Sequence, residues 1–318
     1  GLDIPVSSEH EWIADFQPII EQLGLTKWAF GVPSEELTTF KFGHFGVVPL
    51  TPTPGAYNNG AVDWIGMDPA GLFDAARSRP ESPILIINHP SSSGFSGYFE
   101  AAQYDRDTGA GSAELWSDHF DAIEVFNESD FESNRGASVA DWFSMLNHGY
   151  KFWAVGSSDS HQLRSSPVGY PRTCLNFGHD DPTKLTKEIV RDKVASGPAL
   201  ISGGLFMTVA GPNGEKPGDT VKVAADGTAT FLVTVQAASH IDATKLEVLV
   251  NGESKSVEDL LPMGTGTGKK FVNQVKVTLD AAKSGNWVIF HAKGERDLAP
   301  LHPGRRPFAA TNPFFLEK

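Results

Sequence analysis

The chain has 318 residues, of which 40% are hydrophobic, so it can bury a large core and we expect two domains. Its net charge of -13 argues against a nucleic-acid partner, because phosphate contacts require clustered lysine and arginine side chains. No apolar run approaches the roughly 18 residues of a membrane-spanning helix, so no membrane partner is expected. The single cysteine, Cys174, excludes an intrachain disulfide.

The first part of the chain predicts short strands interspersed with helices. Apolar residues at helical spacing predict a helix from Trp12 that ends at Gly24. Strands are expected over residues 28–32 and 45–50. A second helix begins after Asp68, an N-capping residue that is followed by proline. The inward face of this helix comprises Leu72, Phe73 and Ala76.

Continuous apolar runs in the middle of the chain are typical of strands that are buried on both faces. They cover residues 84–87, 122–126 and 152–155. Helical patterns follow over residues 139–146 and 185–194. Strands that alternate with helices favour a parallel sheet or a barrel.

Beyond about residue 199, apolar and polar residues alternate with period two, and no helical pattern of any length intervenes. Asp226-Gly227 and Asn251-Gly252 supply hairpin turns. We therefore expect a first domain over residues 1–198 and a β-sandwich with a C-terminal tail over residues 199–318. The expected strands of the sandwich cover residues 220–223, 229–236, 245–250, 271–279 and 286–292.

The segment Lys151 to His161 connects one apolar strand to candidate cation ligands. The strand stops at a glycine and is followed by Ser-Ser-Asp-Ser-His, so Asp159 and His161 can both turn toward one ion. A carboxylate oxygen and an imidazole nitrogen both suit zinc, manganese or iron. The alternative is a polar turn in which the aspartate acts as an N-cap.

Metal-capable residues recur at the ends of the predicted strands. A single histidine at such a place is more often structural than a ligand, but the repeated placement along successive strands favours a metal site. We expect the six side chains to converge on one site. They are His10, Glu36, His44, His89, Asp159 and His161, of which His44 opens a strand.

Short motifs around these residues follow one another in a specific order and spacing. They are Ser8-Glu9-His10, Glu36-Leu37-Thr38-Thr39, Gly43-His44-Phe45, Asn88-His89-Pro90, Ile123-Glu124-Val125-Phe126-Asn127, Gly156 to His161, Gly169 to Thr173 and Thr311-Asn312-Pro313. With these motifs the chain resembles the polymerase-and-histidinol-phosphatase (PHP) superfamily. The resemblance is greatest to the branch of carbaryl-hydrolase-like metallohydrolases, and it extends over the whole chain.

The resemblance implies a distorted seven-stranded β/α barrel with two or three divalent cations at its mouth, followed by a β-sandwich. By position, the six candidate ligands correspond to metal ligands of the family. Glu9 stands where the family has an aspartate that supports or bridges metal. The family's first strand carries a His-x-His pair, and this chain begins too late to contain it. We therefore expect a missing N-terminal segment that carries this strand, and an open barrel edge at Leu2 to Val6.

The residues and the resemblance together predict a metal-dependent hydrolase that acts on a small-molecule substrate. A cation bound by histidine and carboxylate lowers the pKa of its water toward about 7. Glu9 and Arg164 are the candidate catalytic residues, and Arg164 and Arg172 are candidates to orient an anionic group. A surface salt bridge is the alternative for both arginines and is favoured for Arg172. The tail that carries His302 and Arg305 is a candidate to fold back over the barrel mouth.

The sequence leaves the reaction open. We favour a phosphoesterase or phosphodiesterase, the commoner chemistry of the superfamily. A carboxylic ester or carbamate hydrolase is the first alternative. A non-catalytic binding protein with a degenerate metal site is the second.

Overall fold

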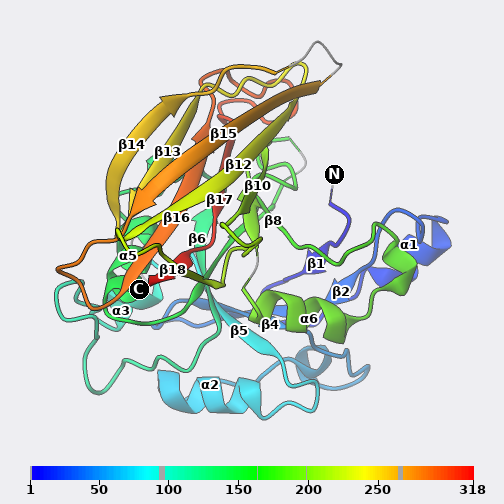
Figure 1. Ribbon diagram of the computed structural model, residues 1–318. Coiled ribbons are helices and arrows are strands. Elements are labelled where there is room, and N and C mark those ends of the chain that lie inside the picture. The colour runs from blue at the N-terminus through cyan, green and yellow to red at the C-terminus, as the bar shows by residue number, and fades with distance from the viewer. Residues whose placement is uncertain (1, 93–96, 163, 198, 264–267) are drawn as a thin grey trace. The chain divides into compact units, whose positions relative to one another are not determined.

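The computed structural model divides the chain into two compact units, each made of two segments (Figure 1). The first unit comprises residues 1–125 and 176–196, and the second comprises residues 126–175 and 197–318. The structure describes residues 2–92, 97–162, 164–197, 199–263 and 268–318. Pro198, the expected domain boundary, lies outside these ranges. The described part of the chain is 34% strand and 16% helix.

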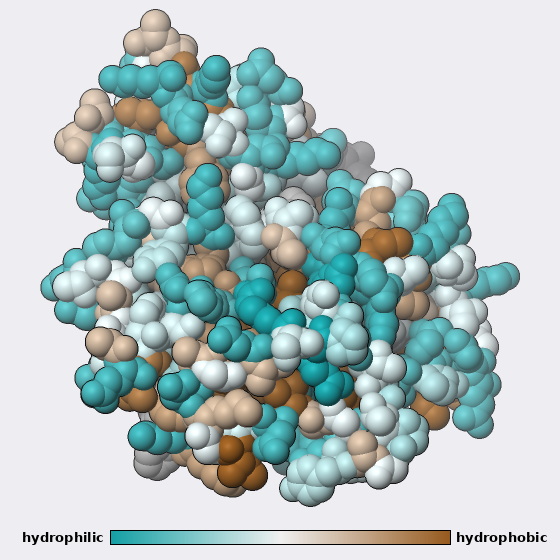
Figure 2. All heavy atoms as spheres, turned by 90° about the horizontal axis from the view of Figure 1, so that it is seen from below, coloured by the Kyte–Doolittle hydropathy of each residue, from teal (hydrophilic) through white to brown (hydrophobic). Residues whose placement is uncertain are grey.

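Within the described ranges, no helix is both long enough and apolar enough to cross a membrane. On the face that Figure 2 shows, hydrophobic side chains lie scattered among hydrophilic ones. Scattered apolar side chains are normal on protein surfaces. This face therefore does not by itself indicate a docking surface.

The first unit is built around neighbouring strands of a mixed sheet. β3 (Glu35–Thr38), β4 (His44–Val48) and β5 (Ile84–Asn88) are successive antiparallel neighbours, and β5 pairs in parallel with β6 (Ala122–Asn127). The apolar runs predicted for β5 and β6 are confirmed as strands. Separately, β1 (Val6–Ser7) pairs in parallel with β2 (Val32–Pro33), so Val6, expected at an open edge, lies opposite Val32.

Helices pack beside these strands. α2 (Pro69–Arg77) lies along β5 (Figure 1), and its N-cap Asp68 accepts a 2.8 Å hydrogen bond from the Gly71 amide. The predicted inward face of α2 is confirmed, because Leu72, Phe73 and Ala76 are buried. The other helical segments of the unit are α1 (Gln17–Gln22), η1 (Tyr57–Gly60), α3 (Tyr98–Ala101), η2 (Pro182–Lys184) and α6 (Lys187–Ala195).

Two sheets form most of the second unit. The three-stranded sheet has the order β10 (Phe206–Ala210), β12 (Thr228–Ala238), β15 (Gly268–Thr278). In the larger sheet, β16 (Asn286–Lys293) is the strand with the most neighbours, pairing with β13 (Lys245–Val250), β17 (Phe308–Thr311) and β18 (Phe314–Glu317). Its remaining strands are β8 (Arg172–Cys174), β9 (Leu200–Ser202), β11 (Thr220–Lys222) and β14 (Glu253–Asp259).

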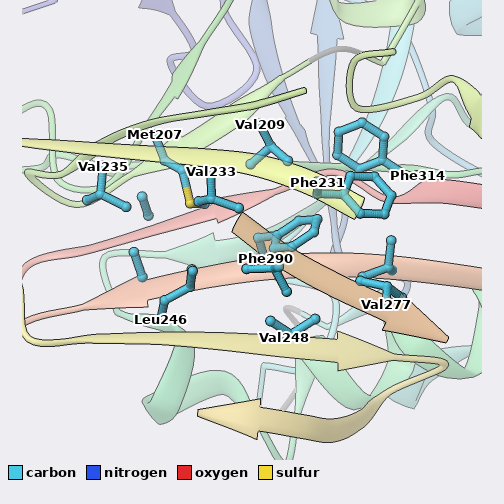
Figure 3. Close-up of a cluster of buried hydrophobic side chains, with 14 of the residues drawn as sticks. Met207, Val209, Phe231, Val233, Val235, Leu246, Val248, Val277, Phe290 and Phe314 are labelled. Atoms are coloured by element: carbon cyan, nitrogen blue, oxygen red, sulfur yellow. The ribbon is translucent and has the colours of Figure 1, made fainter. Parts of the chain in front are cut away.

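The two sheets share one apolar core. Burial alternates along β12, so Phe231, Val233 and Val235 point inward. Figure 3 shows these side chains facing Phe290 and Leu246 of the larger sheet. Two layers that bury their inner faces against each other are the arrangement that period-two segments favour.

The second unit also contains α4 (Phe131–Asn134), α5 (Ser138–Asn147) and β7 (Trp153–Ser157). The side chain of Asn312 anchors β7, because it accepts a bond from the Ala154 amide (2.8 Å) and donates to the Ala154 carbonyl (3.0 Å). A further bond joins Asn312 to the carbonyl of Ala199 (3.2 Å). This fully buried side chain thus pairs with β7 as a neighbouring strand would.

The predicted β/α barrel is wrong. The strands of the described residues form open sheets, and none of these sheets closes on itself. A barrel of this type needs parallel strands joined by crossover helices. Here β3 and β4 are antiparallel and are separated by only residues 39–43, so no helix connects them.

Two elements near the N-terminus also differ from the prediction. Helix α1 has six residues instead of spanning from Trp12 to Gly24, and Ile20 is its single buried residue. Pro18 explains this difference, because proline is tolerated only in the first turn of a helix. The strand predicted over residues 28–32 is confined to its last residue, and Trp28 is 74% exposed.

Candidate metal centre

Antiparallel pairing brings candidate ligands of the first unit to one edge of the sheet. His44 opens β4, and it lies opposite Thr38 at the end of β3 and opposite Asn88 at the end of β5. Residues that lie directly opposite each other in antiparallel strands share a face of the sheet. Glu36 is two residues before Thr38 in β3 and so projects from the same face. Glu36 therefore lies inside a strand, not after a strand end as the sequence suggested.

The carboxylate of Glu36 is the centre of a group that we call the histidine cluster: His10, Glu36, His44 and His89. Glu36 Oε2 lies 2.9 Å from His10 Nδ1, and Oε1 lies 3.3 Å from His89 Nε2 and 3.5 Å from His44 Nδ1. One ligand atom from each of His10, Glu36 and His44 can be chosen so that all lie within 4.8 Å of one another. The structure thus brings together four of the six predicted ligands.

One nitrogen of the cluster is buried without a hydrogen bond. Among the described residues, Nδ1 of His44 has no hydrogen-bond partner, although the Glu36 carboxylate is 3.5 Å away. The His44 ring meets those of His10 and His89 edge-on, with centroids 5.6 and 4.8 Å apart. A buried polar atom normally has a partner, so this nitrogen has the capacity to bind one further group.

Backbone contacts fix His10 and His89 beside Glu36. His10 forms a parallel β-bridge with Glu36, and the Glu36 amide donates to the Glu9 carbonyl at 3.0 Å. His89 follows β5 with a φ of 28°, and its amide donates to Glu124 Oε2 at 2.6 Å. These contacts orient two imidazoles toward one carboxylate.

A glycine leaves room for a contact that crosses β4. Asn88 of β5 donates to Glu36 Oε1 of β3 at 2.9 Å, across β4, where Gly46 lies opposite Glu36 and Ile86. A Cβ atom on Gly46 would come within 3.2 Å of Asn88 Oδ1. The side chain missing at Gly46 therefore permits Asn88 to reach the carboxylate.

The environment of Glu36 keeps it ionised. Burial alone would raise the pKa of this carboxyl, but the imidazoles of His44 and His89 and the amide of Asn88 hold it well below its ordinary value. A buried carboxylate requires compensation by hydrogen bonds or positive charge. The imidazoles and Asn88 supply hydrogen bonds to this carboxylate, and a cation bound there would add positive charge.

The remaining two predicted ligands lie together in the second unit. Asp159 and His161 follow β7, and Asp159 Oδ1 is 3.6 Å from His161 Nδ1. His161 Nδ1 also lies 2.8 Å from the Asp159 carbonyl, which can only accept, so Nδ1 is the donor in this contact. Asn127 donates to Asp159 Oδ2 at 3.1 Å. That all six residues form one site stays a prediction.

The two candidate catalytic residues are both exposed. Among the described residues, the Glu9 side chain forms no hydrogen bond or ion pair, and only its carbonyl contacts Glu36. Arg164 is likewise exposed and is among the residues that line a pocket in the second unit. Arg172 donates to the Gly169 carbonyl at 2.8 Å and is not found in a salt bridge among the described residues.

A second acidic group in the second unit has its charge balanced by the protein. Arg135 contacts Glu132 at 2.8 Å and Glu247 at 2.6 Å, while Lys293 contacts Glu132 at 2.7 Å. Burial lowers the pKa of His291, which lies 3.2 Å from Glu247, so this imidazole is neutral. Two carboxylates therefore face two cationic side chains, and we assign this group a structural role rather than a metal site.

Three residues that support the histidine cluster appeared in the sequence motifs but were assigned no role there. Asn88 bonds the Glu36 carboxylate, Thr38 Oγ1 lies 2.6 Å from His10 Nδ1, and Glu124 holds the main chain of His89. Glu124 was identifiable from the sequence, because it is a charged residue within the apolar run of residues 122–126. The structure shows that it is buried.

Comparison with family models, with curated proteins and with solved structures finds no match for this chain. The resemblance to the PHP superfamily thus stays a hypothesis.

Proposed function

We propose that this protein is a metal-dependent hydrolase and that His10, Glu36, His44 and His89 hold a divalent cation. The observation that carries this proposal is the convergence of three imidazoles on the buried Glu36 carboxylate, where Nδ1 of His44 has no hydrogen-bond partner among the described residues. Three imidazoles around one carboxylate are a ligand set that suits zinc, manganese or iron.

A purely structural cluster is the competing explanation. In the group around Arg135, two cationic side chains balance the two carboxylates, although His291 Nε2 is also buried without a hydrogen-bond partner among the described residues. The histidine cluster combines an ionised buried carboxylate with a nitrogen that lacks a partner among the described residues. The difference in cationic partners supports a bound cation at the histidine cluster rather than at the group around Arg135.

A cation bound there would lower the pKa of its water toward about 7 and so supply hydroxide at neutral pH. The protein's own contribution is to hold the ligands in place. Asn88 and Thr38 orient Glu36 and His10, and Glu124 fixes the turn that presents His89. We propose a phosphoester as the substrate, since phosphoester hydrolysis is the commoner chemistry of the superfamily that the motifs resemble.

Replacement of one ligand tests the proposal. His44→Gln should lower the affinity for zinc or manganese by at least about tenfold, measured by competition with a chromophoric chelator. His119→Gln is the matched control, because His119 is exposed and lies outside the histidine cluster. Equal metal affinity in both variants would contradict the proposal.

Paired assays then address the bond that is cleaved. The metal-loaded protein should hydrolyse an aryl phosphodiester faster than an aryl ester, and His44→Gln should reduce that activity. Turnover of the ester alone would instead indicate a carboxylic ester hydrolase. Metal binding without turnover of either substrate would indicate a binding protein.

A further inference from the structure

A pocket of about 150 Å³ lies within the second unit, next to the loop that carries Asp159 and His161. Its lining includes the segment from Arg164 to Pro167, Tyr170, the tail residues His302, Pro303 and Arg305, and also Glu128 and Ser158. The segment from Arg164 to Pro167 is fixed to Asp159 through Ser166, whose hydroxyl contacts the Asp159 carbonyl at 3.4 Å. The C-terminal tail therefore contributes to a pocket beside two of the predicted ligands.

The pocket has a positive charge in a protein whose net charge is -13. Two guanidinium groups, of Arg164 and Arg305, line it together with a single carboxylate, Glu128. Glu128 accepts a hydrogen bond from the Ser166 hydroxyl, and its other oxygen is 3.7 Å from Arg305 Nη2. That distance exceeds the roughly 2.8 Å of a charge-assisted hydrogen bond, so Arg305 retains donors for another acceptor.

Arg164 has no ion-pair partner within the described ranges. A guanidinium group has five N–H donors in a planar fork that matches the oxygens of phosphate and carboxylate. Two such groups at one pocket favour an oxyanion over a neutral ligand.

The tail holds Arg305 in a defined position. Asp297 accepts bonds from the amides of Ala299 (2.6 Å) and Gly304 (2.8 Å), and the Leu298 amide donates to the Arg305 carbonyl (2.9 Å). The Tyr170 hydroxyl then donates to the carbonyl of the next residue at 2.6 Å. Because these bonds exist before a ligand arrives, binding requires little additional ordering.

The other tail residue of the pocket is an uncharged donor or acceptor. Burial and the nearby Arg172 and Arg305 lower the pKa of His302, so its imidazole is neutral at pH 7. The ring lies 5.4 Å from that of Tyr170. His302 can thus form one hydrogen bond to a bound group without adding charge.

The size of the pocket restricts the ligand. It is much larger than the roughly 15 Å³ that one water needs and smaller than the roughly 300 Å³ of a pocket for a drug-sized molecule. A phosphate or carboxylate group with a few further atoms is of the appropriate size.

We infer that this pocket binds the oxyanion group of a small substrate or product through Arg164 and Arg305. A role in turnover rests on the proposed hydrolase function, whereas binding of the anion does not. The inference adds the C-terminal tail to the binding machinery and narrows the substrate to molecules that carry an anionic group.

Calorimetric titration of the full chain with inorganic phosphate tests the inference, and acetate in a second arm distinguishes a phosphate from a carboxylate site. We expect saturable binding of one of them with a Kd of about 1 mM or lower. Arg164→Gln and Arg305→Gln should each weaken it by about tenfold. Arg306→Gln is the matched control, because Arg306 pairs with Glu295 and does not line the pocket.

The Arg164→Gln and Arg305→Gln variants also separate this inference from the proposed function. The zinc affinity of both variants should equal that of the unchanged protein, since neither arginine belongs to the histidine cluster. Circular dichroism and Arg305→Lys, which keeps the charge, distinguish lost binding from lost folding. Binding of neither anion, or equal binding by all three glutamine variants, would overturn the inference even if zinc binds. Loss of zinc binding with phosphate binding intact would overturn only the proposed function.

Discussion

Two adjacent glutamates of β3 have opposite electrostatic environments. Successive residues of a strand face opposite sides of the sheet, so Glu35 and Glu36 are both buried but meet different neighbours. Imidazoles and an amide keep Glu36 ionised despite its burial. Burial raises the pKa of Glu35 to about 7, although a hydrogen bond from the Val62 amide acts to lower it. Glu35 Oε2 has no hydrogen-bond partner among the described residues. Glu36 is thus suited to hold a cation, and Glu35 is a local source of pH sensitivity.

Glu35 should make the stability of the protein pH-dependent. Its folded-state pKa of about 7 lies above the ordinary value of 4.5, so its contribution to stability is complete below pH 4.5 and is lost as the pH rises through 7. The loss should amount to about 3 kcal/mol. Urea denaturation of chelator-treated protein at pH 5 and pH 8 measures it.

Glu35→Gln should remove most of that difference, because glutamine does not ionise. Glu21→Gln, which changes an exposed carboxyl, is the control and should behave like the unchanged protein. If Glu35→Gln and the unchanged protein lose the same free energy of unfolding between pH 5 and pH 8, Glu35 does not titrate in this range.

At the scale of elements, the histidine cluster depends on the close approach of three strands. Gly46 occupies the middle strand between Glu36 and Asn88. Gly46→Val would place methyl groups where Asn88 now lies, since even a Cβ comes within 3.2 Å of its Oδ1. We expect a loss of about 2 kcal/mol of stability and weaker zinc binding. Gly285→Val, where a Cβ meets no atom within 4 Å, is the control and should retain zinc binding.

Asn312 should be important for the second unit. Asn312→Ala would leave the amide and carbonyl of Ala154 and the carbonyl of Ala199 without this partner in a buried region. Each unpaired buried group costs about 1–3 kcal/mol, so we expect a loss of at least about 3 kcal/mol. Urea denaturation measures it, and Asn213→Ala on an exposed loop is the control. A loss no larger than in that control would show that water replaces these bonds.

Local patterns predicted individual elements better than their arrangement. The caps and apolar spacing of α2 and the apolar runs of β5 and β6 are encoded within a few residues, and the structure has them where expected. The direction of β4 is not encoded locally. Because β4 runs antiparallel to both neighbours, the inferred barrel of parallel strands was wrong.

The candidate site was partly predictable for a related reason. Histidine and glutamate side chains are common metal ligands, so the four members of the histidine cluster could be named from the sequence. Their convergence was expected from parallel strand ends, whereas it arises because the start of β4 meets the ends of β3 and β5. Asn88 and Thr38 carry no distinctive signal, since their role depends on which residue lies opposite them.

At the scale of the whole molecule, each compact unit combines segments that are distant in the chain. Helix α6 belongs to the first unit, where Lys187 donates to Thr51 Oγ1 at 2.6 Å and Arg191 donates to the Glu81 carbonyl at 2.7 Å. The segment 126–175 belongs instead with the sandwich strands. Removal of residues after 198 would therefore deprive β7 of Asn312.

The interleaved units allow a test of where metal binding stabilises the protein. A ligand that binds only the folded state at a hundred times its Kd stabilises that state by about 2.7 kcal/mol. The histidine cluster takes ligands from β3 and β4, whereas β12 and β15 of the second unit contain none of its residues.

Saturating zinc should slow amide hydrogen exchange in β3 and β4 by up to about 100-fold. It should slow exchange less in β12 and β15 if the two units open independently. Equal slowing everywhere would mean that the units unfold as one cooperative structure. Unchanged exchange in β3 and β4 at saturating zinc would contradict a metal site at the histidine cluster.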